Sequence, residues 1–487
     1  MRRVVLLLVD GLRPDVAEEL LAAGALPNLA AMVRQGGAGR ALTVFPSTSI
    51  VAYLPFLTGC TPGRCNVPSI RWLDRTRYGG RWWRERGELR SYCGWQADRL
   101  DDDLSADVRT IFELVPECVG LFSPVTRGLL PARDPTRRSR KRFAALAHYV
   151  LLLQQRADNI VAHHLLQEIE RPWRFVFAQF PAVDAYTHRT TPDSALVTRA
   201  VRRVDAVVGK LCARLVARGE FGDTLILLVS DHGASPVHTH FDLGNWFRGH
   251  GVTTLTHPEV WTRNPRAAVM VAGNGFAMVY ANPGRRRLHR LSVRRLRSAE
   301  AFGCHDDLVY ALAREPAVAF VAGESGDGGL TLISRDGDAE VRRLHRHVLY
   351  RPRTGDPLGL GGPRVGTDDQ WLACSASDLY PDAAVQLLQL FRSPRTGDLV
   401  VVADEGFDLR GRLEFPSHRA GHGSLLRAHM EIPLWSSRPL PAERLRSVDL
   451  FPAMLAWLGL DVPHPIDGRL VWRPCPAAPE RRFACAS

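Results

Sequence analysis

The chain has 487 residues, 45% of them hydrophobic, which is enough to bury a large core in one big domain with insertions or in two domains. This composition excludes a disordered or fibrous chain. The formal net charge of +12, almost all of it from arginine, favours anionic partners such as phosphate esters, nucleotides and acidic lipid surfaces, without choosing among them.

The first predicted element is a strand at residues 4–9, a run of valine and leucine typical of a parallel strand that is covered on both faces. An amphipathic helical stretch is expected over residues 14–35. Two later apolar runs, residues 175–180 and 225–229, are predicted strands, and a helix over about 194–216 joins them. The pattern predicts an α/β fold with a mostly parallel central sheet flanked by helices.

Two stretches of different character separate these core segments. Residues 64–150 are rich in Trp, Arg and Pro, whereas residues 240–405 contain many Gly and Pro turns and short strand-like runs at 267–271 and 276–280. We interpret the first as a cap insertion and the second as an inserted subdomain, both within one catalytic domain that spans residues 1–487. Together they are expected to form the substrate cleft.

The nine cysteines are scattered from Cys60 to Cys485 without paired spacing. Such spacing argues against a disulfide framework and for a reducing compartment, so we expect a cytoplasmic protein. The apolar run at 4–9 is too short for a signal peptide and lacks a small-residue cleavage site. No stretch approaches the roughly 18 apolar residues of a membrane-spanning helix. Peripheral membrane contact stays open, and no specific nucleic-acid motif is found.

Polar side chains gather where the predicted strands end, which is the edge at which α/β sheets place their chemistry. Carboxylate, hydroxyl and imidazole donors of this kind suit zinc or a similar divalent ion. Two such groups can hold two metals about 4 Å apart, which bind both the attacking and the leaving oxygen of an in-line phosphoryl displacement. The residues of this set are Asp10, Ser49, Asp184, His188, Asp231, His232 and His422.

Five motifs in a fixed order carry a resemblance to a known family. They are Val-Asp-Gly-Leu-Arg at 9–13, Phe-Pro-Ser-Thr-Ser at 45–49 with Thr-Gly at 58–59, Asp-Ala-Tyr-Thr-His at 184–188, Ser-Asp-His-Gly at 230–233 and Gly-His-Gly-Ser at 421–424. The set resembles the type I phosphodiesterase/nucleotide pyrophosphatase branch of the alkaline phosphatase superfamily. The likeness spans about residues 3–435, and a C-terminal pattern shared with sulfatases follows at 447–452 and 466–468.

The resemblance implies two metal ions, expected to be zinc, and assigns their ligands. One ion would be held by Asp184, His188 and His422, and the other by Asp10, Asp231, His232 and the nucleophile. The family's nucleophile lies nine positions before the Thr-Gly pair, which points to Ser49, with Thr48 as the alternative. Either hydroxyl is expected near a helix start, where free N–H groups help to bind a phosphate oxygen.

The chain departs from the family at the asparagine that holds a phosphate oxygen, whose expected position falls near Ile70. Asn66 and Arg71 are the candidate substitutes and therefore the predicted substrate-binding residues. The departure argues against a nucleotide substrate more than it argues against phosphate-ester hydrolysis itself. The string at 60–64 resembles the sulfatase signature, but its Cys60 follows the Thr-Gly pair instead of preceding it, so a sulfatase is not expected.

Other conspicuous residues are assigned structural or surface roles. His238 and His240 are expected at the surface or behind the ligands rather than at a third metal, and His418 and His429 are expected to be structural or to tune His422. The arginine runs at 137–142 and 285–297 are interpreted as solvated faces, with attraction of an anionic substrate or lipid head group as the alternative. The stretch at 143–153 and the tryptophans at 72, 82 and 83 are assigned to cap packing, the alternatives being a surface amphipathic helix and a stacking platform for substrate.

The sequence therefore predicts a metal-dependent hydrolase of small-molecule phosphate esters, of the phosphodiesterase/nucleotide pyrophosphatase type, with a serine nucleophile at a two-metal site. One alternative is a phosphomonoesterase or phosphonate hydrolase, because the same core serves all of these chemistries and the insertions decide specificity. The other is a catalytically silent binding homologue that keeps the fold.

Overall fold

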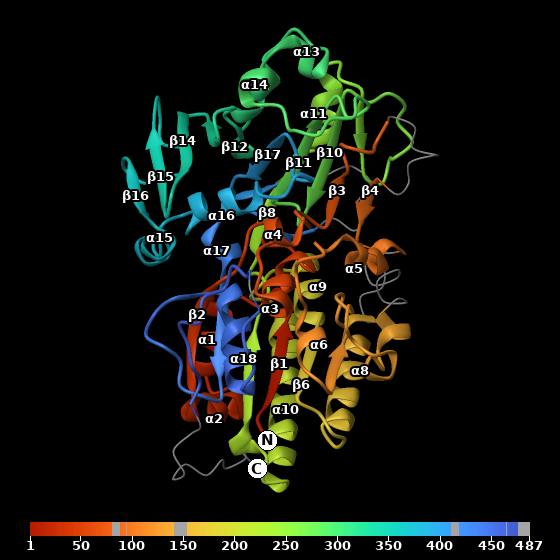
Figure 1. Cartoon of the computed structure of the whole chain (residues 1–487), viewed down its shortest axis with the longest axis vertical. Coiled ribbons are helices and arrows are strands. Elements are labelled where there is room, and N and C mark those ends of the chain that lie inside the picture. Colours follow the sequence, from red (N-terminus) through yellow and green to blue (C-terminus); the bar gives the residue numbers. More distant parts are fainter. Residues whose placement is uncertain (80–87, 94, 141–152, 411–417, 464, 476–487) are drawn as a thin grey trace.

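The computed structural model describes residues 1–79, 88–93, 95–140, 153–410, 418–463 and 465–475 (Figure 1). Within these ranges the core is a seven-stranded sheet in the order β21-β2-β20-β7-β1-β6-β5. Neighbouring strands from β7 to β5 are parallel, whereas β20 runs antiparallel to both β7 and β2. The strands are β1 (Arg3–Val9), β2 (Gly37–Leu42), β5 (Cys118–Leu121), β6 (Phe175–Phe180), β7 (Thr224–Val229), β20 (Glu431–Ser436) and β21 (Leu445–Arg446). The α/β fold with a mostly parallel central sheet is confirmed.

The apolar run of β1 is explained by helices on both faces of the sheet. Val4, Leu6 and Leu8 point into one core together with α3 and α18, while the alternate side chains point into a second core with α1, α2, α8 and α10. Figure 1 shows α10 and α18 beside the central strands. These helices are α1 (Pro14–Ala22), α2 (Pro27–Gln35), α3 (Leu54–Thr58), α8 (Leu153–Glu168), α10 (Ala195–Ala217) and α18 (Leu450–Leu458).

The stretch at 14–35 forms two helices rather than one continuous helix. Gly24 adopts a left-handed conformation with φ of +70°, and Pro27 begins the second helix. The axes of α1 and α2 differ by 99°. Among the described residues no single helix is long and apolar enough to cross a membrane, and only this bent pair satisfies the length and composition of a span when its two helices are taken together.

A second sheet of nine strands, in the order β16-β15-β14-β13-β12-β17-β11-β10-β9, lies at the other end of the molecule (Figure 1). All its strands fall between residues 254 and 403. They are β9 (Thr254–Thr256), β10 (Ala267–Ala272), β11 (Phe276–Ala281), β12 (Val318–Glu324), β13 (Gly329–Ser334), β14 (Gly337–Leu344), β15 (His347–Pro352), β16 (Arg364–Thr367) and β17 (Leu399–Ala403). Helices α11 (Leu243–Gly249), α12 (Val293–Leu296), α13 (Ala299–Phe302), α14 (Leu308–Ala313), α15 (Asp368–Cys374) and α16 (Ala383–Leu390) accompany it.

The region 64–150 contains short elements, of which β3 contacts β10 of the second sheet, and it also supplies the edge strand β5 of the central sheet. Trp72 is buried, donates to the Tyr92 hydroxyl and lies under the guanidinium of Arg395, so it packs inside this region. Trp82, Trp83 and most of residues 143–153 lie outside the described ranges. The short elements are α4 (Pro62–Cys65), β3 (Arg71–Leu73), β4 (Leu89–Ser91), α5 (Leu100–Asp103) and α6 (Ile111–Leu114).

The basic run at 285–297 is only partly a solvated face. Arg287 pairs with the buried Asp398, and Arg290, whose side chain is 10% exposed, pairs with Glu324. These two arginines hold the loop against the nine-stranded sheet. The eight cysteines in the described part of the chain form no disulfide with one another.

Candidate active site

The side chains of the predicted cluster are delivered by the ends of three neighbouring parallel strands. Asp10 follows β1, Asp231 and His232 follow β7, and α9 (Ala182–Arg189) begins directly after β6. Because parallel strands end at the same edge, these residues meet there. Asp184 and His188 are four positions apart and share one face of α9. His422 follows β19 (Ala420–Gly421), which pairs with β8 (Ser235–His240) and so returns to the same edge.

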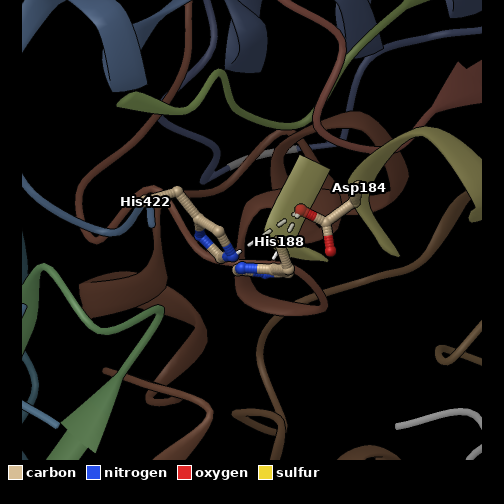
Figure 2. Close-up of side chains that lie close together, drawn as sticks. All are labelled: Asp184, His188 and His422. Atoms are coloured by element: carbon tan, nitrogen blue, oxygen red, sulfur yellow. Dashed lines mark ion pairs between the residues drawn. The ribbon is translucent and has the colours of Figure 1, made fainter. Parts of the chain in front are cut away.

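Asp184, His188 and His422 form the first potential metal-binding group (Figure 2). Oδ1 of Asp184 lies 3.4 Å from Nε2 of His188 and 3.9 Å from Nε2 of His422. Nδ1 of His188 is 2.9 Å from the carbonyl oxygen of Ala420, and Nδ1 of His422 is 2.9 Å from that of Ser47. A carbonyl can only accept, so each Nδ1 carries a hydrogen, and in the neutral ring this leaves the lone pair of Nε2 facing the group.

The second group consists of Asp10, Asp184 and His232, with Asp231 beside it. Nε2 of His232 lies 3.5 Å from Asp10 Oδ1 and 3.1 Å from Asp231 Oδ2. Its Nδ1 donates to the carbonyl of Gly233, and in the neutral ring this leaves the lone pair of Nε2 facing the group. The Ser49 hydroxyl completes this group, 3.1 Å from Asp10 Oδ1 and 3.0 Å from His232 Nε2.

Gly11 allows the turn after β1 to lie close to α9 and to the loop after β7. Its φ of +69° is left-handed, and an added Cβ would lie 2.8 Å from Cβ of Asp184. Its N–H donates to Asp231 Oδ1 at 3.2 Å. Glycine is therefore required in the Asp-Gly motif both for the turn and for the close approach of α9.

The electrostatics of the cluster call for a cation. Burial, and then the charge of Asp184, raises the pKa of Asp10, and burial with the charges of Asp10 and Asp184 raises the pKa of Asp231. Burial, and then His232, lowers the pKa of His422, so this ring is neutral. Oδ1 of Asp184 and Oδ2 of Asp231 are buried and accept no hydrogen bond from the described residues. Carboxylates and neutral imidazoles arranged in this way fit divalent metal ions.

Comparison with known proteins identifies the family. The model of the family "Type I phosphodiesterase / nucleotide pyrophosphatase" matches residues 4–314. The chain belongs to this family. It is therefore a phosphoric ester hydrolase of the alkaline phosphatase superfamily and a member of a metal-dependent group of enzymes. No protein of curated function matches the sequence significantly.

Solved structures share the fold of this phosphodiesterase-family chain at low sequence identity. Phosphonoacetate hydrolase from Sinorhizobium meliloti 1021, in complex with phosphonoformate, has a TM-score of 0.57 and 16% identity, over 93% of this chain and 95% of that chain. Human ectonucleotide pyrophosphatase/phosphodiesterase 5 has a TM-score of 0.57 and 13% identity, over 96% and 97% of the two chains. The murine protein, as an inactive variant in complex with AMP, has a TM-score of 0.55 and 13% identity, over 96% and 98%.

The two predicted substrate-binding residues of this phosphodiesterase-family chain occupy different places. Asn66 ends α4 in a left-handed conformation, and its Oδ1 accepts from the Ser393 hydroxyl, so its described contacts tie α4 to the segment after α16 rather than to the potential metal groups. Arg71 donates to the carbonyl of Val271 and lines a cavity of about 630 Å³ between β3 and residues 242–271, together with Arg248 and Trp261. Of the two, the structure places Arg71 at a cavity.

Three histidines outside the potential metal groups differ in their distance from those groups: one lies at the surface and two lie beside them. His240 is 39% exposed and pairs with the buried Asp408, so it lies outside the metal groups that the described residues form. His418 lies against the His188 ring, with centroids 4.2 Å apart, and its Nδ1 is 2.9 Å from the side-chain amide of Asn274. His429 is buried and hydrogen-bonds to Ser235 and Ser424, which lie within three positions of His232 and His422 respectively.

Two residues that hold Asp10 were not anticipated from the sequence. The Tyr53 hydroxyl and the Gln179 side-chain amide both donate to Asp10 Oδ2. Gln179 is the single strongly polar residue in the apolar run of β6 and pairs in register with Leu8, two positions before Asp10. This interruption of an otherwise apolar strand was the available signal. Tyr53 carries no comparable signal.

Proposed function

We propose that the chain is a phosphodiesterase of the nucleotide pyrophosphatase type that acts on a small-molecule phosphate ester through Ser49 at a two-metal site. The observation that carries this proposal is the position of the Ser49 hydroxyl, within 3.1 Å of both Asp10 and His232. The hydroxyl of Thr48, by contrast, is buried and has no hydrogen-bond partner among the described residues. A nucleophile needs neighbours that remove or disperse its proton, which favours Ser49.

The proposed ligands are Asp184, His188 and His422 for one ion and Asp10, Asp231 and His232 for the other. Divalent ions, for which we propose zinc, would supply the positive charge that lowers the pKa of the serine hydroxyl and stabilises the leaving oxygen. Ser49 Oγ then bonds to phosphorus while the bond from phosphorus to the leaving oxygen breaks, and that oxygen keeps the electron pair. The Ser49 proton passes to solvent, and hydrolysis of the resulting serine phosphodiester by water releases a phosphate monoester and restores the hydroxyl.

A phosphonate hydrolase or phosphomonoesterase is the second candidate. It is supported by the fold similarity to phosphonoacetate hydrolase and by the departure from the family at the phosphate-binding asparagine. The family membership and the complete set of donor side chains argue against a silent binding homologue. From the spacing of the cysteines we further propose a cytoplasmic location.

The test is a comparison of three substrates with the zinc-loaded enzyme: bis(p-nitrophenyl) phosphate, p-nitrophenyl phosphate and phosphonoacetate. A phosphodiesterase cleaves the diester with the highest kcat/KM, whereas preference for the monoester or the phosphonate moves the assignment to the second candidate. Asp231→Asn serves as the inactive reference, and His240→Asn, at an exposed ring outside both metal groups, serves as the matched control. Cleavage of none of the three by metal-replete enzyme contradicts the proposal.

A further inference from the structure

His429 is a buried histidine that belongs to neither potential metal group, yet it touches both of the loops that carry their ligands. It lies in α17 (Arg427–Met430) and is 3% exposed. Nδ1 is 3.2 Å from the backbone nitrogen and 2.8 Å from the hydroxyl of Ser424. Nε2 is 2.8 Å from the hydroxyl of Ser235.

The backbone contact determines which ring nitrogen carries the hydrogen. The N–H of Ser424 can only donate, so Nδ1 accepts and is unprotonated. The hydrogen of the neutral ring is therefore on Nε2, where it is donated to Ser235. Burial lowers the pKa of His429 to about 3, so the ring is neutral over the working range of the enzyme. The two nitrogens thus make chemically different contacts, one as acceptor and one as donor.

Each contact reaches a different group of proposed ligands. Ser424 is two positions past His422, and its carbonyl accepts from the hydroxyl of Ser47, whose own carbonyl accepts from His422 Nδ1. Nδ1 of His429 therefore holds the loop that directs His422 into the first group. This contact also reaches the segment that carries Ser49.

The contact of Nε2 reaches the loop after β7, because Ser235 is three positions past His232. In the same loop the N–H of Gly233 donates to the carbonyl of His429 at 2.9 Å. An added Cβ at Gly233 would lie 2.1 Å from the carbonyl oxygen of Ala428, so the two backbones are already in close contact. Nε2 and the carbonyl of His429 therefore hold the loop that carries Asp231 and His232.

We propose that His429 is a positioning residue that sets the geometry of both metal sites, each through a different ring nitrogen. Nδ1 positions His422 for the first ion, and Nε2 positions Asp231 and His232 for the second. This inference rests on the proposed two-metal site. Residues that orient metal ligands typically change metal affinity by about 10-fold to 100-fold when they are replaced.

Two amide substitutions separate the contacts. His429→Asn places its amide oxygen near the position of Nδ1, where it accepts from Ser424, but is too short to reach Ser235. His429→Gln extends its amide nitrogen toward the position of Nε2, where it donates to Ser235, but does not accept from Ser424. The asparagine variant is therefore expected to weaken the second metal site and the glutamine variant the first.

The measurement is zinc affinity of the metal-stripped full chain, by competition with a coloured chelator. A His188→Ala background reports the second site alone, and an Asp231→Ala background reports the first. In these backgrounds His429→Asn should raise the zinc dissociation constant of the second site about 10-fold to 100-fold, and His429→Gln should raise that of the first site by the same factor. Each variant should leave the dissociation constant of the other site within about 3-fold of its value without the substitution. His163→Asn and His163→Gln, at an exposed position of α8, are the matched controls.

A purely structural role predicts a different result, namely a lower unfolding temperature of the metal-free protein with equal changes at both sites. Equal or absent changes in the two variants therefore overturn the inference. If the substitutions at His429 prevent folding, Ser424→Ala and Ser235→Ala remove the two hydroxyl partners singly, with the N–H of Ser424 left in place, and must reproduce the same site selectivity. Wild-type protein that binds fewer than two zinc ions refutes the two-metal proposal itself, whereas two-ion binding with unselective variants refutes only the role of His429.

Discussion

Replacement of the two neighbouring hydroxyls, Ser49→Ala and Thr48→Val, tests which of them is the nucleophile. Ser49 Oγ contacts Asp10 and His232, so alanine removes the attacking atom and should lower kcat by about 10⁴-fold or more, close to the effect of deleting other enzyme nucleophiles. This corresponds to about 5 kcal/mol of activation free energy. The loss of folding stability should be only about 1 kcal/mol, because each partner loses one hydrogen bond.

Thr48→Val should keep the activity of the enzyme and should not lower its stability. The Thr48 hydroxyl is buried without a partner, and leaving such a group unsatisfied costs about 1–3 kcal/mol. Valine keeps the methyl group that would meet an added Cβ at Gly273 and removes only the unpaired oxygen. The variant should therefore be as stable as wild type or more stable, with kcat within about 3-fold of wild type, since no transition-state contact is removed.

The assay combines hydrolysis of bis(p-nitrophenyl) phosphate with urea unfolding and with mass spectrometry of acid-quenched enzyme. Wild type and Thr48→Val should show a peptide that contains residue 49 and carries a p-nitrophenyl phosphate group, and Ser49→Ala should show none. The reasoning is refuted if Ser49→Ala retains wild-type kcat, or if Thr48→Val is the variant that loses both activity and the modified peptide.

Three further predictions concern stability and metal. Asp398→Ala should lower the free energy of unfolding in urea by about 3–5 kcal/mol, because it leaves Arg75, which is 1% exposed, buried without its carboxylate. Asp327→Ala, which breaks an exposed ion pair, should have a much smaller effect on unfolding, and similar losses in both variants would contradict this reasoning. Burial raises the pKa of Asp158 to about 8, so between about pH 4 and pH 8 the folded state binds more protons than the unfolded state and stability falls as pH rises. Asp158→Asn should therefore gain stability over wild type progressively across that window, and parallel urea-unfolding profiles would refute the assignment. Chelation of divalent ions should lower the unfolding temperature near neutral pH and abolish hydrolysis, because the buried carboxylates of the cluster then face one another without a cation. Added zinc should restore the unfolding temperature and the activity. A metal site is contradicted if chelator changes neither of them.

The core of the fold was predictable from the sequence because fully buried parallel strands are continuous apolar runs. The predicted strands at 4–9, 175–180 and 225–229 agree with β1, β6 and β7 to within one residue, and the helix expected over 194–216 is α10, capped by Ser194. The order of polar motifs after these strands indicated a family, and the family model bears this out. That these motifs meet follows from parallel strand direction alone.

Contacts between segments that are distant in the sequence could not be predicted from the local sequence pattern. The helical period at 14–35 did not reveal the turn around Gly24 and Pro27, and the asparagine at 66 is drawn to Ser393, a residue more than 300 positions away. The antiparallel strand β20 and the parallel edge strand β5 also depend on pairing partners far along the chain. Such pairings are decided by packing and register, which no local periodicity encodes.

The sequence by itself determined which chemical groups this protein has at the carboxyl edge of its sheet, because strand direction and motif order are properties of the chain. Only the tertiary structure decided which of two adjacent hydroxyls faces Asp10 and His232, and that His429 contacts both ligand loops. Adjacent residues share one local sequence context but point in different directions. The direction each takes is determined by the turn and by the segments packed against it.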